Sequence, residues 1–463
     1  MWKYFKNKKE EIFQIIRRIF RRDFRGYSGL AIKNSFYQFS TTVITNVSSL
    51  ILLVILARIL MPELFGLYSL ALSTILLFVA FSNLGVGEAV IKYLSRELEK
   101  NNLGKAKAYA MHLVKIRVFL IVIFSFLLVL LSRFISTTYY NKPLFLALFF
   151  VGPLFIIFSS LISLIQLFFQ AGNNFKIPFY KEVFSQIIKL IIMPLAVLYF
   201  ITLSSNAETK IFILMLSLTF VWILTFIFFI FLMKRNLTYL NHKKDNLSNK
   251  EKKGVNSFVR KISLYTLAGL FLGYLDLLFL GRFVTSDYIG YYRVALSFIE
   301  TAGPILTFTT VLFPIFSRLK GKRLEAGFRK SASIIFFISL FVSLAVFLIS
   351  PIIVTLLYGN EYVNSINLLR ILSLLIIALP LIYLYNTYFV SQGKIRVITK
   401  VLLVSTILNF VLNATFIFFF IKYNPIFVVY GICISTVVTK YFYLALLMRS
   451  KQKIARHVPK ILT

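Results

Sequence analysis

Runs of about 20 apolar residues recur along the whole 463-residue chain and constrain its fold more than any other feature. A helix of about 20 residues has the length that crosses the hydrocarbon core of a bilayer. The chain is 59% hydrophobic, above the roughly 45–50% apolar share of soluble domains. We therefore expect an all-α polytopic membrane protein with about 12 spans, at 36–57, 65–90, 113–134, 144–170, 183–203, 209–233, 261–281, 288–317, 331–357, 367–390, 398–420 and 425–449.

Two stretches of the chain carry nearly the same sequence. Residues 57–73 read ARILMPELFGLYSLALS, and residues 281–297 read GRFVTSDYIGYYRVALS. The ungapped identities include Arg58 with Arg282, Gly66 with Gly290, and Tyr68 with Tyr292. Six spans, an even number, separate the copies, so both have the same orientation in the membrane. The repeat predicts two six-helix lobes related as parallel repeats about an axis along the membrane normal.

The chain divides into five regions on this basis. They are a basic N-terminal arm (1–35), an N-terminal lobe (36–233), a cytoplasmic linker (234–260), a C-terminal lobe (261–449) and a basic tail (450–463). Apolar residues of the arm fall at helical spacing, which favours an amphipathic helix in the membrane interface over a disordered basic tail.

Positive charge is distributed unevenly between the two sides of these spans. Of the 52 Lys and Arg residues, 42 lie in the segments on the side of the two termini. Cytoplasmic loops of membrane proteins are enriched in Lys and Arg, so we expect both termini in the cytoplasm and the protein in the cytoplasmic membrane. The net charge of +36 then indicates contact with anionic membrane lipids and not with nucleic acid.

The sequence carries no cluster that would support catalysis. Cys433 is the single cysteine, and the three histidines do not cluster. Phosphate-loop, HExxH and GxSxG motifs are absent, and the outer loops hold only scattered carboxylates. We therefore expect a protein that is not an enzyme and that needs no cofactor or metal.

Charged residues inside the spans are the candidate functional residues, because a charge within the membrane is costly. Asp276 and Glu300 are candidates for ion coupling, either to protons or to sodium. A carboxylate in a low-dielectric site takes up and releases protons near neutral pH. The alternative is that each carboxylate is held by an Arg or Lys partner, which for Asp276 would be Arg282, or reaches an interfacial water layer.

Four basic residues are candidates for substrate binding. Lys189 and Lys440 would bind an anionic headgroup in a central cavity; the alternatives are pairing with a carboxylate for Lys189 and snorkelling for Lys440. Arg58 and Arg282 would form a mouth for an anionic substrate. The alternative is that they are interfacial arginines neutralised by Glu63 and Asp287.

Several motifs resemble one known family. They are Leu56-Ala57-Arg58, Pro62-Glu63, Phe65-Gly66 and Tyr68, followed by Asn83-Leu84-Gly85, Ala89 and Lys92, with VLFPIFSRL (311–319) and YGICISTVVT (430–439). This pattern is similar to the polysaccharide-transport branch of the multidrug/oligosaccharidyl-lipid/polysaccharide exporter superfamily, which includes the Wzx-type O-antigen flippases. The resemblance extends over essentially the whole chain.

The resemblance implies two lobes around a central cavity and transport by alternating access. It implies a flippase for a polyprenyl-pyrophosphate-linked oligosaccharide in surface glycan biosynthesis, with a glycan polymerase or ligase as a further partner. The alternative from the same superfamily is a cation-coupled multidrug or small-molecule exporter, which would favour an acidic cavity.

Overall fold

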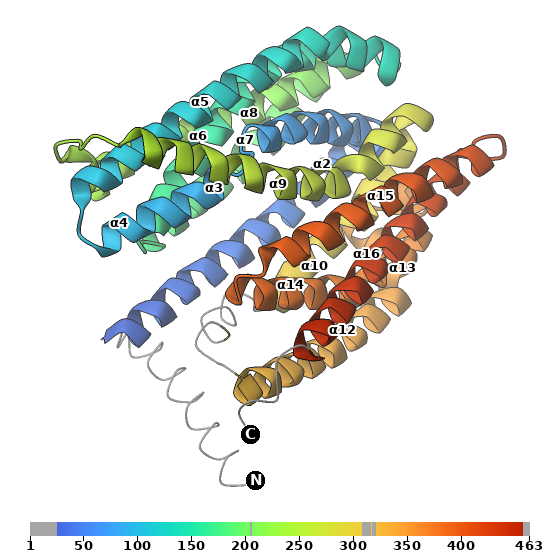
Figure 1. Ribbon diagram of the computed structural model, residues 1–463. Helices are drawn as coiled ribbons and strands as arrows, with labels where there is room; N and C mark the ends of the chain where they lie inside the picture. The colour runs from blue at the N-terminus through green and yellow to red at the C-terminus, as the bar shows by residue number, and fades with distance from the viewer. Residues whose placement is uncertain (1–25, 204–205, 308–315, 317–320, 457–463) are drawn as a thin grey trace.

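The computed structural model describes residues 26–203, 206–307, 316 and 321–456, and these residues are helical with short connections and no strands (Figure 1). The N-terminal lobe holds α2 (Gly26–Phe81), α3 (Val86–Ala89), η1 (Val90–Leu94), α4 (Ser95–Glu99), α5 (Leu103–Arg133), η2 (Phe134–Tyr139), α6 (Phe145–Ala171), α7 (Lys176–Leu203) and α8 (Ala207–Asn236). After η3 (Thr238–Asn241), the C-terminal lobe holds α9 (Asn249–Phe283), α10 (Ser286–Thr307), α12 (Gly321–Tyr358), η4 (Asn360–Tyr362), α13 (Ser365–Ser373), α14 (Leu375–Ser391), α15 (Ile395–Phe420) and α16 (Pro425–Arg456).

Ten segments of the described chain are long and apolar enough to cross a membrane. The first of them, Lys33–Phe81, contains the first predicted span and most of the second, because α2 is kinked at Met61. Met61 has φ 61°, a left-handed value that is unusual for a side chain other than glycine, and Pro62 follows it. Helix α10 covers the first part of the eighth predicted span. The predicted all-helical, multi-pass membrane fold is confirmed.

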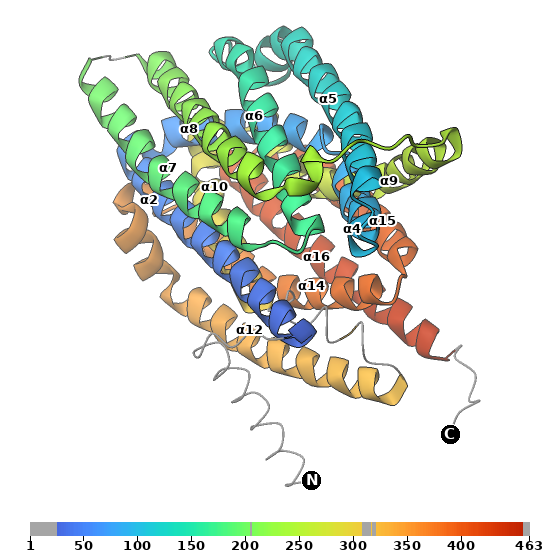
Figure 2. The ribbon, with the colours of Figure 1, turned by 90° about the vertical axis from the view of Figure 1, so that its left-hand side faces the viewer.

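Two groups of helices pack side by side (Figures 1 and 2). In the first group α7 packs against α2 and α8, and α6 packs against α5 and α8. In the second, α15 packs against α9 and α16, and α12 packs against α13 and α14. The most extensive contact between the groups joins α2 to α10, which are the two helices that carry the sequence repeat.

The repeated glycines lie at this crossing of α2 and α10. A Cβ added to Gly66 would collide with the carbonyl oxygen of Ser286 and would lie 2.8 Å from the amide nitrogen of Gly290. A Cβ added to Gly290 would in turn collide with the carbonyl oxygen of Pro62. The two copies of the repeat therefore pack directly on each other, and glycine at both positions lets the backbones approach closely.

The predicted linker is partly helical in the structure. Helix α9 begins at Asn249, with a capping box between Ser248 and Glu251, so residues 249–260 belong to this helix. Its first turns lie on the N-terminal lobe, where Lys105 Nζ lies 3.0 Å from Glu251 Oε1. Of the predicted N-terminal arm, residues 26–35 belong to α2, whereas residues 1–25 lie outside the described part of the chain, as do residues 457–463 of the predicted tail.

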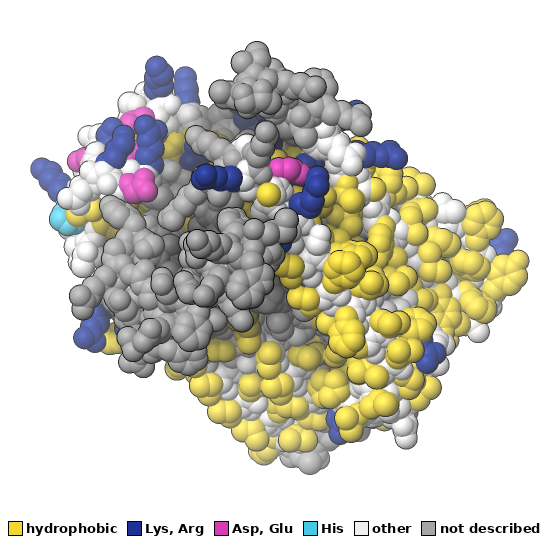
Figure 3. Space-filling model, turned by 90° about the horizontal axis from the view of Figure 1, so that it is seen from below, with side chains coloured by type: hydrophobic (Ala, Val, Ile, Leu, Met, Phe, Trp, Pro, Cys, Tyr) yellow, Lys and Arg dark blue, Asp and Glu magenta, His cyan; other side chains and the backbone are white. Residues whose placement is uncertain are grey.

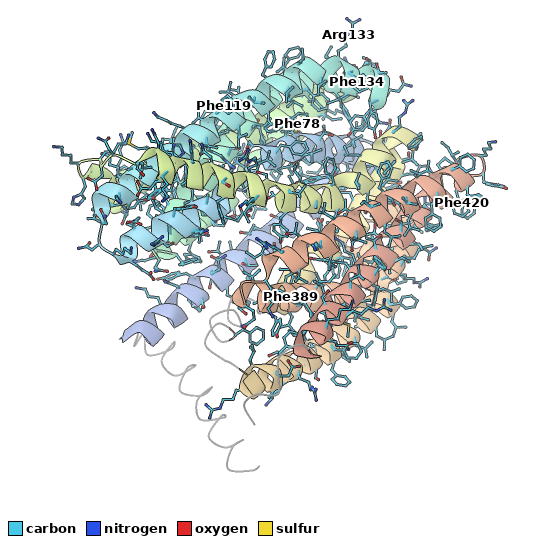
Figure 4. All side chains as sticks on the ribbon, in the orientation of Figure 1. Phe78, Phe119, Arg133, Phe134, Phe389 and Phe420 are labelled. Carbon is cyan, nitrogen blue, oxygen red and sulfur yellow. The ribbon has the colours of Figure 1, made fainter. Side chains whose placement is uncertain are left out.

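Apolar side chains on the outside of the bundle mark the surface that faces lipid. Phe119 on α5 is 65% exposed, Phe341 on α12 is 75% exposed and Phe418 on α15 is 76% exposed. Figure 4 shows Phe119 on α5, with Arg133 and Phe134 at the end of that helix far from the chain termini. Hydrophobic side chains also cover the right and lower parts of Figure 3, whereas basic side chains gather at its upper left.

Candidate functional site

A cavity of about 270 Å³ lies at the junction of the two lobes. Helices α2, α6, α7, α8 and α10 line it, and most of the lining side chains are apolar, among them Phe65, Phe155 and Trp222. The serine hydroxyls of Ser49, Ser69 and Ser73 and the cationic side chains of Lys189 and Arg293 also line it. A mostly apolar cavity with a few convergent polar groups is typical of a ligand site.

Lys189 reaches the cavity from α7, as the sequence predicted. Its Nζ lies 3.4 Å from the hydroxyl of Ser49 on α2. Glu182, two helical turns earlier, is already paired, because its carboxylate lies 2.6 Å from Lys181 Nζ and 2.6 Å from Gln186 Nε2. Among the described residues no carboxylate forms an ion pair with Lys189, so its charge is available to a ligand.

Arg293 brings the second positive charge, from α10 of the opposite lobe. Its Nη1 donates to Glu300 Oε2 at 3.1 Å, and the Arg293 side chain is 25% exposed. Arg293, near the start of the predicted span at 288–317, was not among the predicted site residues. Its position within an apolar span, aligned by the repeat with Ser69, is the signal that would have identified it.

Glu300 therefore has a partner, which was the alternative left open for it. The Glu300 side chain is 50% exposed, two helical turns from Arg293 on the same helix. A carboxylate that neutralises Arg293 and remains half exposed is poorly suited to a buried ion-coupling site. It instead lowers the net positive charge of this part of the cavity.

Asp276 lies in a buried polar cluster between α9, α10, α15 and α16. Its Oδ1 accepts a hydrogen bond from Asn413 Nδ2 at 2.8 Å. Its Oδ2 accepts from the hydroxyls of Tyr292 at 3.0 Å and Thr436 at 2.5 Å. The Asn413 amide also contacts Asn409, and the buried Asn413 Oδ1 has no hydrogen-bond partner among the described residues. Oxygen atoms of several side chains thus surround one carboxylate, and the buried Cys433 on α16 also lies within electrostatic range of it.

Lys440 lies one helical turn beyond Thr436 on α16 and is half-buried. It is close enough to Asp276 and Glu300 to interact with their charges. The cavity of Lys189 and Arg293 is lined by other residues. Lys440 thus lies within electrostatic range of both carboxylates, and its role in binding a headgroup stays a prediction.

Arg58 and Arg282 are exposed and lie away from the cavity lining. Arg58 Nε donates to the carbonyl oxygen of Leu357 at 2.7 Å, and Arg282 Nη1 donates to the carbonyl oxygens of Thr138 and Tyr139. Arg282 is thus bound to main-chain oxygens of the other lobe and not to Asp276, its predicted partner. Asp276 Oδ2 instead accepts hydrogen bonds from the hydroxyls of Tyr292 and Thr436. The partners seen here are main-chain oxygens and not Glu63 or Asp287, and the role of the two arginines as a substrate mouth stays a prediction.

Arg117, near the start of the predicted span at 113–134, was not among the predicted site residues. Arg117 lies on α5 and is 1% exposed. Its guanidinium donates to the carbonyl oxygen of Ser82 at 2.9 Å, to Asn83 Oδ1 at 2.6 Å and to the carbonyl oxygen of Ser160 at 3.3 Å. These bonds join α2, α5 and α6 inside the N-terminal lobe, so Arg117 organises the lobe and does not face the cavity.

The family model described as "Polysaccharide biosynthesis protein" matches residues 31–320, more than half of the chain. The chain belongs to this family. The search of curated protein sequences returned no match.

Solved structures with the same fold come from related transporters. The lipid II flippase MurJ in an inward closed conformation is 14% identical, with a TM-score of 0.69 over 91% of this chain and 87% of that one. A multidrug resistance MATE transporter is 16% identical in both its inward-facing form, with a TM-score of 0.66 over 92% of this chain and 96% of that one, and its outward-facing form, with a TM-score of 0.64 over 93% and 97%. At these identities the likeness concerns the fold alone.

Proposed function

We propose that this family member is a flippase that moves a lipid-linked oligosaccharide of the polyprenyl-pyrophosphate type across the cytoplasmic membrane. The observation that carries the proposal is that Lys189 and Arg293 line one cavity from opposite lobes. Two cations suit a pyrophosphate, and the hydroxyls of Ser49, Ser69 and Ser73 suit the hydroxyls of a sugar. The lipid tail would remain in the bilayer while the headgroup enters between the lobes.

The size of the cavity requires that the lobes move. A volume of about 270 Å³ is smaller than a site for an oligosaccharide headgroup, since sites for drug-sized ligands span roughly 300–1,000 Å³. The lobes must therefore separate before the substrate enters. Rocking of two parallel lobes about the crossing of α2 and α10 supplies this movement and exposes the site to each side in turn.

Orientation follows from charge in this proposal. With 42 of the 52 Lys and Arg residues on the side of the termini, both termini lie in the cytoplasm. The substrate is then loaded where it is synthesised and is released at the outer surface. A glycan polymerase or ligase at that surface would take the released product.

Ion coupling belongs to the Asp276 cluster in this proposal, and Glu300 serves as the partner of Arg293. The Asp276 carboxylate and the amide and hydroxyl oxygens around it are hard oxygen ligands of the kind that suit sodium. Protonation of the carboxylate is the other way to neutralise its negative charge. The unpartnered Asn413 Oδ1 supports a further donor or cation there. Lys440, within range of the Asp276 charge, would respond to the ion.

The experiment depletes the protein and measures which side of the membrane the lipid-linked oligosaccharide occupies. A membrane-impermeant glycan-modifying enzyme added to spheroplasts reports the outward fraction. Cells that rely on Lys189→Ala or Arg293→Ala should show a roughly tenfold slower appearance of outward substrate, because each variant removes one charged contact. Arg133→Ala, which removes an outer-end arginine far from the cavity, is the matched control.

Unchanged sidedness on depletion, in a strain without a second flippase, would reject the flippase function. It would favour the second candidate, a cation-coupled multidrug exporter. The observation in favour of that candidate is the fold shared with MATE transporters, whereas the two cations in the cavity argue against cationic drugs as substrates. If depletion traps the substrate inside but both alanine variants transport normally, the flippase function stands and the assigned binding residues are wrong.

A further inference from the structure

A set of hydrogen bonds joins the two lobes at one end of the molecule. This end holds the kink of α2 at Met61, the end of α9 at Phe283 and the end of α12 at Tyr358. It is the end that the charge distribution assigns to the outer side. Arg58 and Arg282, which the substrate cavity does not use, both lie here.

Arg58 of the N-terminal lobe caps a helix of the C-terminal lobe. Its Nε donates to the carbonyl oxygen of Leu357 at 2.7 Å, and its Nη2 donates to that of Leu356. These carbonyls belong to the last turn of α12, where they lack partners within the helix and carry the negative end of its dipole. Tyr362 returns the contact, because its hydroxyl donates to the carbonyl oxygen of Ala57 at 2.9 Å.

Arg282 of the C-terminal lobe makes the equivalent contact in the opposite direction. Its Nη1 donates to the carbonyl oxygens of Thr138 at 3.0 Å and Tyr139 at 2.9 Å, at the end of η2, which continues α5. Lys142 returns this contact, because its Nζ donates to the carbonyl oxygen of Gly281 at 3.2 Å. Ala57-Arg58 and Gly281-Arg282 are the same positions of the repeat, so the two sets are related by the symmetry of the lobes.

We propose that Arg58, Tyr362, Arg282 and Lys142 form an outer latch that holds the two lobes closed on this side and releases when the transporter opens outward. The latch rests on the proposed function only for the direction of transport. Each latch residue donates from one lobe to a main-chain oxygen of the other, so separation of the lobes breaks all four contacts together.

Exposure of the two arginines makes the latch reversible. Arg58 and Arg282 are both exposed, so water replaces their hydrogen bonds when the lobes part. A buried cation such as Arg117 would instead lose its partners without compensation. Such contacts shift the equilibrium between the closed and the open state towards the closed state without preventing opening.

Arg370 lies at the same end but makes its hydrogen bonds within one lobe. Its Nε donates to Ser350 Oγ at 3.1 Å and its Nη1 to Asn367 Oδ1 at 3.3 Å, both within the C-terminal lobe. Opening of the lobes leaves these bonds intact. Arg370→Ala is therefore the matched control for the latch variants.

The test measures how fast a cysteine in the cavity reacts with a reagent from outside. The full chain carries Cys433→Ala, which removes the buried native thiol, and Ser69→Cys, which lines the cavity. A membrane-impermeant maleimide is added to intact cells. Arg58→Ala and Arg282→Ala should each raise the labelling rate roughly tenfold and the double variant should raise it further, while Arg370→Ala leaves it unchanged.

Arg58→Lys keeps the charge but loses the forked geometry, so it should give an intermediate rate even if an alanine variant folds poorly. A labelling rate in the arginine variants equal to that of Arg370→Ala would overturn the latch, whatever the substrate is. Faster labelling in cells whose lipid-linked oligosaccharide does not depend on this protein would keep the latch and reject the proposed substrate.

Discussion

Replacing Gly66 with alanine tests the idea that the repeat exists because α2 and α10 pack on each other at their glycines. The added Cβ would collide with the carbonyl oxygen of Ser286 and approach the amide nitrogen of Gly290 to 2.8 Å. These are main-chain atoms, which cannot rotate away as a side chain would. The two helices must move apart, and such overpacking typically costs about 1–3 kcal/mol.

Gly273→Ala is the matched control within a membrane helix. A Cβ at Gly273 meets no atom within 4 Å, whereas both substitutions gain about 1 kcal/mol of helix propensity. The difference between the two variants therefore isolates the collision at the crossing. At about 2–4 °C per kcal/mol for a mid-sized domain, Gly66→Ala should melt several degrees below Gly273→Ala.

The assay is thermal unfolding of the detergent-solubilised protein, followed by the loss of its monodisperse peak in size-exclusion chromatography. Gly290→Ala should repeat the result, because its Cβ would collide with the carbonyl oxygen of Pro62. Equal melting temperatures for Gly66→Ala, Gly290→Ala and Gly273→Ala would refute a close crossing and, with it, the proposed point of rotation.

Two further predictions concern the buried polar groups. Arg117→Ala should destabilise the protein by roughly 3 kcal/mol, because it leaves the buried carbonyl oxygens of Ser82 and Ser160 without donors. Thermal unfolding checks this, with Arg133→Ala as the control. Equal melting temperatures for the two variants would contradict it. Asp276→Asn keeps the size of the side chain but removes its charge. Transport should therefore lose its dependence on sodium or pH at a normal protein level, whereas Glu300→Gln should retain it, and the reverse pattern would return ion coupling to Glu300.

Local properties of the chain were sufficient to predict the fold. Apolar runs of the length of a membrane span predict helices, because the bilayer leaves no water to satisfy a backbone in another conformation. The kink that joins the first two spans was the main departure, since it depends on the backbone conformation of Met61 and on the packing of Pro62 against Gly290 of the other lobe. The start of α9 at Asn249 was also missed, because a polar capping sequence in a charged region resembles a linker.

The site was predicted only in part. Lys189 was selected because a charge in a membrane span is expensive, and the structure places it in the cavity between the lobes. Arg293 has the same property but lies near a predicted span end, where an arginine is ordinarily interfacial. Asp276 was selected on the same ground as Lys189, but its partners Tyr292, Asn413 and Thr436 come from three other helices, which sequence spacing cannot bring together.

The sequence by itself determined the membrane class, the two repeated lobes and the family, because hydrophobic length, charge asymmetry and local motifs are properties of neighbouring residues. Only the tertiary structure decided what the repeated arginines and glycines do. Arg58 and Arg282 bind main-chain oxygens, and Gly66 and Gly290 lie against main-chain atoms. Every residue has these main-chain atoms, so the residue types in the sequence do not reveal the partners. Such partners become visible only when the two lobes are placed against each other.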